Sequence, residues 1–242
     1  MILSFLRSNL TVVTLNQSQL LYPWLIILTI RLAIKTGYAK IINMKRITIA
    51  ICLLLSGYGS YSQIEWELTK EKNGIKVYTA NETSSKIKSI KVEAVLTGTL
   101  QKLVKILRDV RNNKDWVFST KQSYLLSEVS ANELLYYSET ALPWPVSNRD
   151  IPVRLRLNLN ASNNTLKVTA SGEPNALPVQ KGIVRIQFFS TSWYVKYVGK
   201  NKISIIYYLR MDPSGNVPAQ VTNMFITKGP YETFENLSKL LE

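Results

Sequence analysis

Alternating apolar and polar residues predict an antiparallel sheet along most of the chain after its first quarter. Residues 66–80 form two short apolar runs around Asn73-Gly74, a dipeptide typical of a tight hairpin turn. The segment 86–96 alternates, with Ile90, Val92, Ala94 and Leu96 on one face and Lys91 and Glu93 on the other, which indicates a half-buried strand. Further strands are expected over 122–129, 133–141, 149–159, 165–170, 182–198 and 202–211.

Two segments have helical spacing instead. Thr99 is expected to cap a helix that runs from Leu100 to about Val110. A longer amphipathic helix is expected from Pro218 to the C-terminus, and Gly229-Pro230 should kink it or divide it in two. The apolar faces of a curved sheet and of this helix should close on each other, which predicts an α+β fold. Periodicity leaves open whether the interior is solid or hollow.

The composition excludes much of ordinary enzyme chemistry. The chain has 242 residues, 46% of them apolar, and contains no histidine and one cysteine, Cys52. A Ser-His-Asp triad, a Cys-His dyad, a His-ligated zinc site and an intramolecular disulfide are therefore impossible. We expect no metal and no cofactor.

The charge is strongly basic but scattered. Lys and Arg number 30 against 16 Asp and Glu, a formal net charge of +14. Nucleic-acid binding would require these charges to cluster, and they are spread along predicted strands instead, so no nucleic-acid partner is expected. A weak, transient attraction to anionic membrane surfaces is the more natural use of this charge.

The N-terminal part is basic, apolar and free of acidic residues, as targeting segments are. Met44-Lys45-Arg46 has the pattern of the basic start of a secretory signal, and Ile47–Leu55 (ITIAICLLL) that of its apolar core. Ser56–Ser62 supplies small and polar residues before Gln63. We therefore expect export to the periplasm or the medium, with cleavage near Gln63.

Two interpretations remain for the residues before Met44. Either Met44 is the true start, or the apolar segment Leu20–Ile34, which includes Arg31, associates the chain with a membrane. The expected organisation is an N-terminal extension (1–43), a signal peptide (44–62) and one folded domain (63–242).

Several short motifs in this domain resemble the START domain, the steroidogenic-acute-regulatory-related lipid-transfer family. The most specific are Leu142–Asp150 (LPWPVSNRD) and Asp212–Pro218 (DPSGNVP), whose separation matches that family. The other motifs are Gly74–Tyr78, Asp109 with Trp116, Gly182–Arg185, and Asn223 to Pro230 with Thr233.

The resemblance implies a helix-grip fold, in which a curved antiparallel sheet wraps around a long C-terminal helix. It also implies a tunnel for one lipid, fatty acid or sterol-like molecule, roofed by that helix, and binding or transfer without catalysis. The partner is then a hydrophobic small molecule, and a monomer is expected.

The alternation of side chains along the strand 149–159 indicates which of its residues face the expected cavity. Leu155 shares a face with Val153 and Leu157, whereas Arg154 and Arg156 lie on the opposite face. Some sterol-binding members of the family place an inward arginine where this chain has Leu155, so a largely apolar cavity is expected. The expected walls are Ile90, Val92, Tyr137, Val153, Leu155, Leu157, Phe188, Ile205, Tyr207, Val221, Met224 and Phe225.

A smaller set of residues is expected to shape or gate the cavity: Trp144, Arg149, Asp150, Gly229 and Pro230. Trp144 is expected to form either a rigid turn or a gate. Arg149 and Asp150 are expected either to anchor the start of their strand or to contact the ligand. The break at Gly229-Pro230 suits a hinge that lets the roof move.

Two other functions remain open. One is a helix-grip enzyme, such as a polyketide cyclase, that would use Glu139, Tyr137 or Tyr207 in the pocket. The other is a structural domain with a filled core and no ligand. Lipid that co-purifies with the folded domain would favour the lipid-binding interpretation over both.

Overall fold

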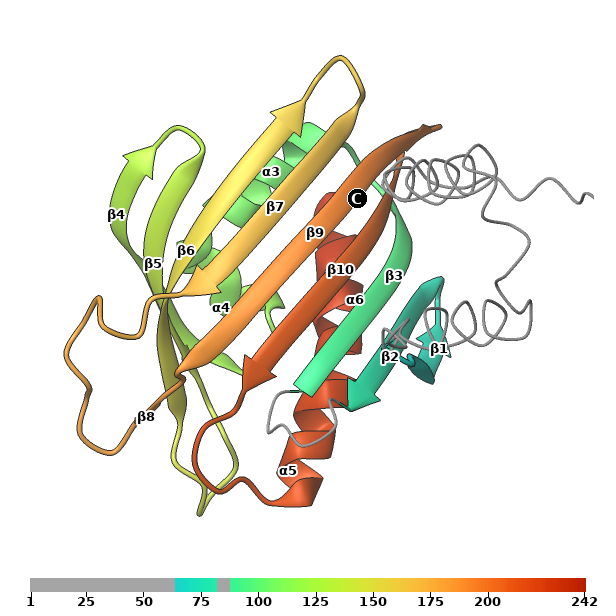
Figure 1. The fold of residues 1–242 in the computed structure, drawn as a ribbon. Coiled ribbons are helices and arrows are strands. Elements are labelled where there is room, and N and C mark those ends of the chain that lie inside the picture. Colours follow the sequence, from blue (N-terminus) through green and yellow to red (C-terminus); the bar gives the residue numbers. More distant parts are fainter. Residues whose placement is uncertain (1–63, 82–87) are drawn as a thin grey trace, which may run out of the picture. The chain divides into compact units, whose positions relative to one another are not determined.

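The computed structural model describes residues 64–81 and 88–242, which form a sheet with helices on one side (Figure 1). Along the sheet the strands are β1 (Glu67–Lys72), β2 (Ile75–Asn81), β3 (Lys88–Thr97), β10 (Lys202–Asp212), β9 (Phe188–Gly199), β7 (Thr165–Gly172), β6 (Arg149–Asn160), β5 (Glu133–Thr140) and β4 (Thr120–Ser130). Neighbours on this path are antiparallel, and the short β8 (Val184–Arg185) pairs with β6 in parallel.

The sequence signals explain the local structure. Asn73 and Gly74 both have positive φ, 53° and 75°, as the predicted type I′ turn between β1 and β2 requires. The side chain of Thr99 accepts a hydrogen bond from the amide of Lys102 and caps α3 (Leu100–Arg108). This helix, η3 (Val110–Asn112) and α4 (Asn113–Trp116) carry the chain from β3 to the far edge of the sheet at β4.

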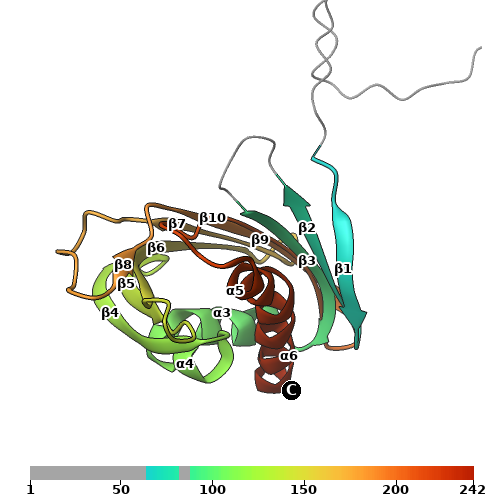
Figure 2. The ribbon, with the colours of Figure 1, turned by 90° about the horizontal axis from the view of Figure 1, so that it is seen from below.

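The sheet curves, and the helices lie on its concave side (Figure 2). The last helix, α6 (Gly229–Leu241), buries a stripe at helical spacing against the sheet: Tyr231, Phe234, Leu237 and Leu241. Two side-chain hydrogen bonds join α6 to the end of α4 and the segment after it, from Asn236 to the Trp116 carbonyl (3.4 Å) and from the Phe118 amide to Thr233 (3.0 Å). The helix is thus held against both the sheet and α4.

The C-terminal helix is divided, as predicted, but it stays helical throughout. It begins with α5 (Ala219–Asn223), passes through one π-helical turn, η4 (Met224–Lys228), and continues as α6. Gly229 keeps an ordinary helical backbone, with φ −57° and ψ −50°. The break is therefore a change of hydrogen bonding rather than an interruption of the helix.

The predicted α+β, helix-grip class is confirmed, and two details differ. The run 182–198 divides into β8 and β9, because the amide of Ile186 bonds to the Asp150 carbonyl and that of Gln187 to the Ser214 hydroxyl. The segment from Val110 to Trp116, for which no helix was predicted, forms η3 and α4.

The predicted extension, signal peptide and cleavage point lie outside the described residues. Within residues 64–81 and 88–242, no helix is both long and apolar enough to cross a bilayer.

Candidate functional site

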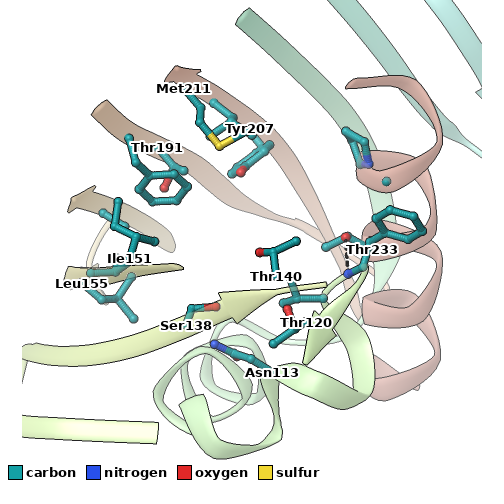
Figure 3. Close-up of a pocket in the computed structure, with 18 of the residues that line it drawn as sticks. Asn113, Thr120, Ser138, Thr140, Ile151, Leu155, Thr191, Tyr207, Met211 and Thr233 are labelled. Carbon is teal, nitrogen blue, oxygen red and sulfur yellow. Dashed lines mark hydrogen bonds between the residues drawn. The ribbon is translucent and has the colours of Figure 1, made fainter. Parts of the chain in front are cut away.

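A cavity of about 220 Å³ lies between the concave face of the sheet and the helices (Figure 3). We call it the inner cavity. Strands β5, β6, β7, β9 and β10, helices α3, α4 and α6, and the turn η4 all contribute side chains to it. Its lining residues are Leu107, Asn113, Trp116, Val117, Phe118, Thr120, Tyr136, Ser138, Thr140, Ile151, Val153, Leu155, Ala170, Ile186, Phe189, Thr191, Trp193, Tyr207, Leu209, Met211, Phe225, Gly229, Pro230, Thr233 and Phe234.

The walls of the inner cavity differ in polarity. Figure 3 shows Asn113, Thr120 and Ser138 together on the side of α4 and β5, and Ile151 and Leu155 together on another side. Within residues 64–81 and 88–242, no lysine, arginine, aspartate or glutamate lines this cavity. The predicted, largely apolar interior is therefore modified by an uncharged polar wall of hydroxyl and amide groups.

A second cavity, of about 130 Å³, adjoins the first. We call it the outer cavity, and its lining residues are Lys88, Phe118, Thr140, Leu142, Arg149, Ile186, Met211, Pro213, Val217, Thr222, Phe225 and Ile226. Phe118 and Phe225 line both cavities, and their rings meet edge to face with centroids 5.3 Å apart. This aromatic pair therefore stands where the two cavities meet.

Gly229 allows α6 to approach this aromatic pair closely. A β-carbon at position 229 would lie 2.8 Å from the Cδ1 atom of Phe118, which is shorter than any normal contact. The residue predicted as a hinge thus also makes room for a ring that separates the two cavities.

Arg149 lies in the wall of the outer cavity and is only 5% exposed. Its guanidinium donates to the carbonyl oxygens of Ser147, Pro213 (3.2 Å) and Ser214 (3.0 Å). Burial lowers the pKa of Arg149 from its ordinary value. The side chain therefore joins two loops through backbone atoms, as one of the two sequence interpretations expected.

Some of the residues predicted as cavity walls do line the inner cavity. They are Val153, Leu155, Tyr207 and Phe225, together with Gly229 and Pro230 from the predicted gate. Leu155 faces inward, whereas Arg154 and Arg156 on the other face form ion pairs with Glu133. The parity argument for β6 is thus correct.

Other predicted wall residues lie elsewhere. Ile90, Val92, Leu157 and Ile205 are buried in the packed core and line neither cavity. Strand β3 packs directly against α6, so the space in front of its inner face is filled. On the C-terminal helix, Val221 and Met224 also line neither cavity, and Thr222 and Ile226 line the outer one.

The expectation that Tyr137 and Phe188 point inward is wrong: their neighbours Tyr136 and Phe189 line the cavity instead. Successive side chains of a strand alternate between faces, so each adjacent pair divides between the two sides. Tyr137 is nevertheless fully buried and stacks on Tyr124, with ring centroids 4.8 Å apart.

A polar cluster lies close to Tyr137 on the outer face of the sheet. Asp150 and Arg185 form a bidentate ion pair there, with distances of 2.7 and 3.0 Å. Arg185 also donates to three backbone carbonyls, those of Pro174, Leu177 and Pro178. Asp150 thus pins its strand, which is one of the two roles expected for it.

Glu139 also lies on the outer side of β5 and is 1% exposed. Its carboxylate accepts hydrogen bonds from Lys121 (3.0 Å), Gln122 (2.7 Å) and Asn148 (2.7 Å). Asn148 in turn accepts from the Leu142 amide, which closes the loop that carries Trp144. Trp144 itself is 93% exposed at that loop's surface.

The tyrosines of the inner cavity are held in their neutral form. Burial raises the pKa of Tyr136 to about 12. Burial also raises the pKa of Tyr207, and the nearby Tyr136 adds to this shift. Their hydroxyls can exchange hydrogen bonds with a guest molecule at neutral pH but are poor proton acceptors.

Sequence reasoning missed the polar wall. Asn113 follows a short 3₁₀ turn without apolar periodicity, and nothing local shows that it becomes buried. Ser138 and Thr140 have the polarity of a solvent-facing strand side. Ser138 and Thr140 share a face of β5 with Tyr136, and because the sheet curves, this face lines the inner cavity.

Comparison with known proteins identifies relatives over this same region. The START domain family model matches residues 59–242. An uncharacterised protein of Pseudomonas aeruginosa is 23% identical over 197 residues, covering 81% of this chain and 96% of its own length. Mouse phosphatidylcholine transfer protein is 26% identical over 169 residues, covering 68% of this chain and 78% of its own.

Solved structures share the architecture. A STAR-related lipid transfer protein fragment from Xanthomonas axonopodis superposes with a TM-score of 0.66 and 28% identity, covering 73% of this chain and 98% of the fragment. Human STARD10 superposes with a TM-score of 0.63 at 18% identity, covering 75% of this chain and 74% of its own, and supports the fold alone.

Proposed function

The chain belongs to the START domain family, and from this premise we propose that it binds one lipid in the inner cavity and transfers it without catalysis. The observation that carries the proposal is the space between sheet and helices, about 220 Å³, lined by apolar and uncharged polar side chains. An engineered apolar cavity of about 150 Å³ is known to hold benzene, so this one has room for part of a hydrocarbon chain.

The lining supplies the affinity that such a role needs. Transfer of hydrocarbon out of water contributes roughly 0.8 kcal/mol per methylene. Leu155, Met211 and Phe234 provide apolar surface, and the wall of Asn113 and Ser138 provides partners for an ester or hydroxyl group. The names of two relatives, phosphatidylcholine transfer protein and STAR-related lipid transfer protein, agree with a lipid as the ligand.

The enzyme alternative has less support. A cyclase would need an acid or base in the cavity, and no carboxylate or cationic side chain of the described residues lines the inner one. Glu139, one of its candidates, is on the outer side of β5 and bound by three neighbours. The raised pKa of the remaining candidate in the cavity, Tyr207, opposes its use as a base.

Lipid exchange requires the roof of the cavity to move. We place this motion in the C-terminal helix, at the π-helical turn η4 and Gly229, where helical hydrogen bonding changes. Trp144, exposed on the neighbouring loop, would contact the membrane while the roof is open. We expect this contact to be transient.

Export also remains part of the proposal. The basic and apolar pattern of residues 44–62 predicts a signal peptide, and the START match begins at residue 59, close to its predicted end. The exported protein would then consist of the domain that starts near Gln63.

Native mass spectrometry of the protein recovered from the exported fraction tests both parts. We expect a mass that begins near Gln63, plus the mass of one extractable lipid. Ala170→Phe, which places a ring in the inner cavity from β7, should lower binding of a fluorescent fatty acid about tenfold or more.

The matched control is Thr169→Phe, because Thr169 is the neighbour on the opposite face of the same strand. It should leave binding unchanged. Equal binding by wild type and Ala170→Phe, or no lipid in the wild-type protein, would contradict the proposed site.

A further inference from the structure

Arg149 is a buried cation that has no buried counter-charge beside it. It is 5% exposed, and within the described part of the chain no carboxylate lies within 4.0 Å of its guanidinium. Its printed partners are the three carbonyl oxygens of Ser147, Pro213 and Ser214. Carbonyl dipoles solvate the charge without neutralising it.

The other buried arginine of the domain shows the usual arrangement. Arg185 also donates to three carbonyls, but it faces Asp150 in a bidentate pair. Removing a charge from water costs several kcal/mol unless an opposite charge compensates it. Arg149 therefore lies in a place where an added anion would be favoured.

The outer cavity provides the space for that anion. Arg149 and Lys88 both line it, from β6 and β3, and Thr140 and Thr222 add hydroxyl groups. The remaining lining is apolar. A guanidinium has five N–H donors, so the three bonds to carbonyls leave two for a guest.

We propose that the outer cavity, with Arg149 and Lys88, binds the anionic oxygen group of an amphiphile, a phosphate or a carboxylate. This rests on the proposed lipid-binding function and names its ligand class. The hydrocarbon part passes the Phe118–Phe225 pair into the inner cavity, which the outer cavity adjoins through shared lining residues.

The division of charge between the two cavities supports this orientation. None of the described residues that line the inner cavity is charged, so an anionic head placed there would be buried without compensation. Among the described residues, the outer cavity is lined by two cationic side chains, Lys88 and Arg149, and by no acidic one. The ligand's charged group is thus drawn to the outer cavity and its tail to the inner one.

Equilibrium binding to paired probes tests the inference. Oleate is compared with oleyl alcohol, and phosphatidic acid with the diacylglycerol of the same acyl chains, all on the purified wild-type domain. We expect the anionic member of each pair to bind about tenfold or more tightly, as charge-assisted hydrogen bonds would give.

Lys88→Gln should reduce this preference several-fold, because it removes one of the two cationic side chains that line the outer cavity. Lys196→Gln is the matched control, because Lys196 is exposed on β9 and lines neither cavity, and it should leave the preference intact. Arg149→Lys keeps the charge but not the planar fork and should weaken anionic probes more than neutral ones. If Arg149→Lys fails to fold, Lys88→Gln and the wild-type preference still decide the question.

A competition experiment with inorganic phosphate distinguishes a lipid headgroup from a free anion as the ligand of the outer cavity. If phosphate competes with oleate but not with oleyl alcohol, both anions use the proposed site. If phosphate binds while anionic and neutral lipids bind equally, the outer cavity serves a free anion and the headgroup assignment is overturned. Equal binding of all lipids without any effect of phosphate also overturns it, yet leaves the proposed lipid-binding function standing. Failure of every lipid to bind would contradict that function itself.

Discussion

Glu139 is the residue through which acid should weaken the fold. Burial by itself raises the pKa of its carboxyl group, but hydrogen bonds from Asn148, Lys121 and Gln122 outweigh burial and hold the pKa below its ordinary value. A carboxylate with a lowered pKa stabilises the folded state above the pKa of the unfolded chain. That contribution is lost as the pH falls through the lower, folded-state pKa.

Glu139→Gln should therefore make the free energy of unfolding depend less on pH under acidic conditions. At pH 7 the variant should be less stable by about 1–3 kcal/mol, because three donors lose a charged acceptor. As the pH falls from about 4 through the lowered pKa of the folded-state carboxyl group, the difference from wild type should shrink, because the wild-type side chain becomes protonated and uncharged like glutamine. Urea unfolding at a series of pH values measures this.

Glu67→Gln is the control for that series, because Glu67 is exposed on the edge strand β1. Its profile should follow the wild type. A constant difference between Glu139→Gln and wild type at every pH would show that the carboxylate's charge does not matter.

At the scale of elements, the C-terminal helix combines a packed half with a less buried half. Along α6 a full stripe of apolar residues is buried, whereas no residue of α5 or η4 is. The π-helical turn joins the two halves next to the Phe118–Phe225 pair. Opening at α5 and η4 would expose the outer cavity without unfolding the core.

Gly229→Ala separates two roles for this glycine. Alanine favours a helix by about 1 kcal/mol over glycine, yet its β-carbon would overlap the ring of Phe118. We expect a net loss of about 1–3 kcal/mol of stability, relieved in the double variant Gly229→Ala/Phe118→Ala. Thermal unfolding of Gly229→Ala, Phe118→Ala and the double variant measures this coupling.

The hinge hypothesis makes a different prediction for the same change. If Gly229 is a hinge, alanine should slow lipid exchange more than it alters equilibrium loading, whatever it does to stability. Stopped-flow transfer of a fluorescent lipid between vesicles reads the rate. An unchanged rate would leave close packing against Phe118 as the only role of Gly229.

At the scale of the whole molecule, the loop with Trp144 and the net positive charge of residues 63–242 both favour contact with an anionic membrane. Trp144 is almost fully exposed, and its loop is held to β5 through Asn148 and Glu139. Tryptophan is enriched at membrane interfaces because its ring is apolar and its N–H is polar.

Trp144→Ala should weaken binding to vesicles of equal parts phosphatidylglycerol and phosphatidylcholine by about tenfold, since a large side chain no longer enters the interface. Soluble fatty-acid binding should be unaffected. Val129→Ala is the control, because Val129 is an exposed apolar residue near the opposite end of β5. Vesicle flotation measures both, and equal loss in both variants would rule out a specific role for Trp144.

Local signals were sufficient for the strands, the hairpin turn at Asn73-Gly74 and the capped helix after Thr99, because each depends on neighbours in sequence. Strand alternation also identified which residues share a face, as for Leu155 against Arg154. The motifs Leu142–Asp150 and Asp212–Pro218 were enough to identify the family, which the match to residues 59–242 confirmed.

What covers each face was decided by tertiary structure. Tyr136 and Tyr137 are adjacent aromatic residues of one strand, but Tyr136 lines the inner cavity, whereas Tyr137 is buried on the opposite face and stacks on Tyr124. Likewise, Ile90 and Val92 face the concave side as expected, and only the packing of α6 on β3 fills the space before them.

The same distinction holds for the chemistry of the site. Its residue types are present in the sequence, whereas their environment arises from chain segments far apart along it. The charge of Arg149 was evident from the start, but only the fold shows three carbonyls and no carboxylate around it. Alternation depends on backbone geometry within one strand, whereas a cavity is the space left between elements whose packing is settled by all of them together.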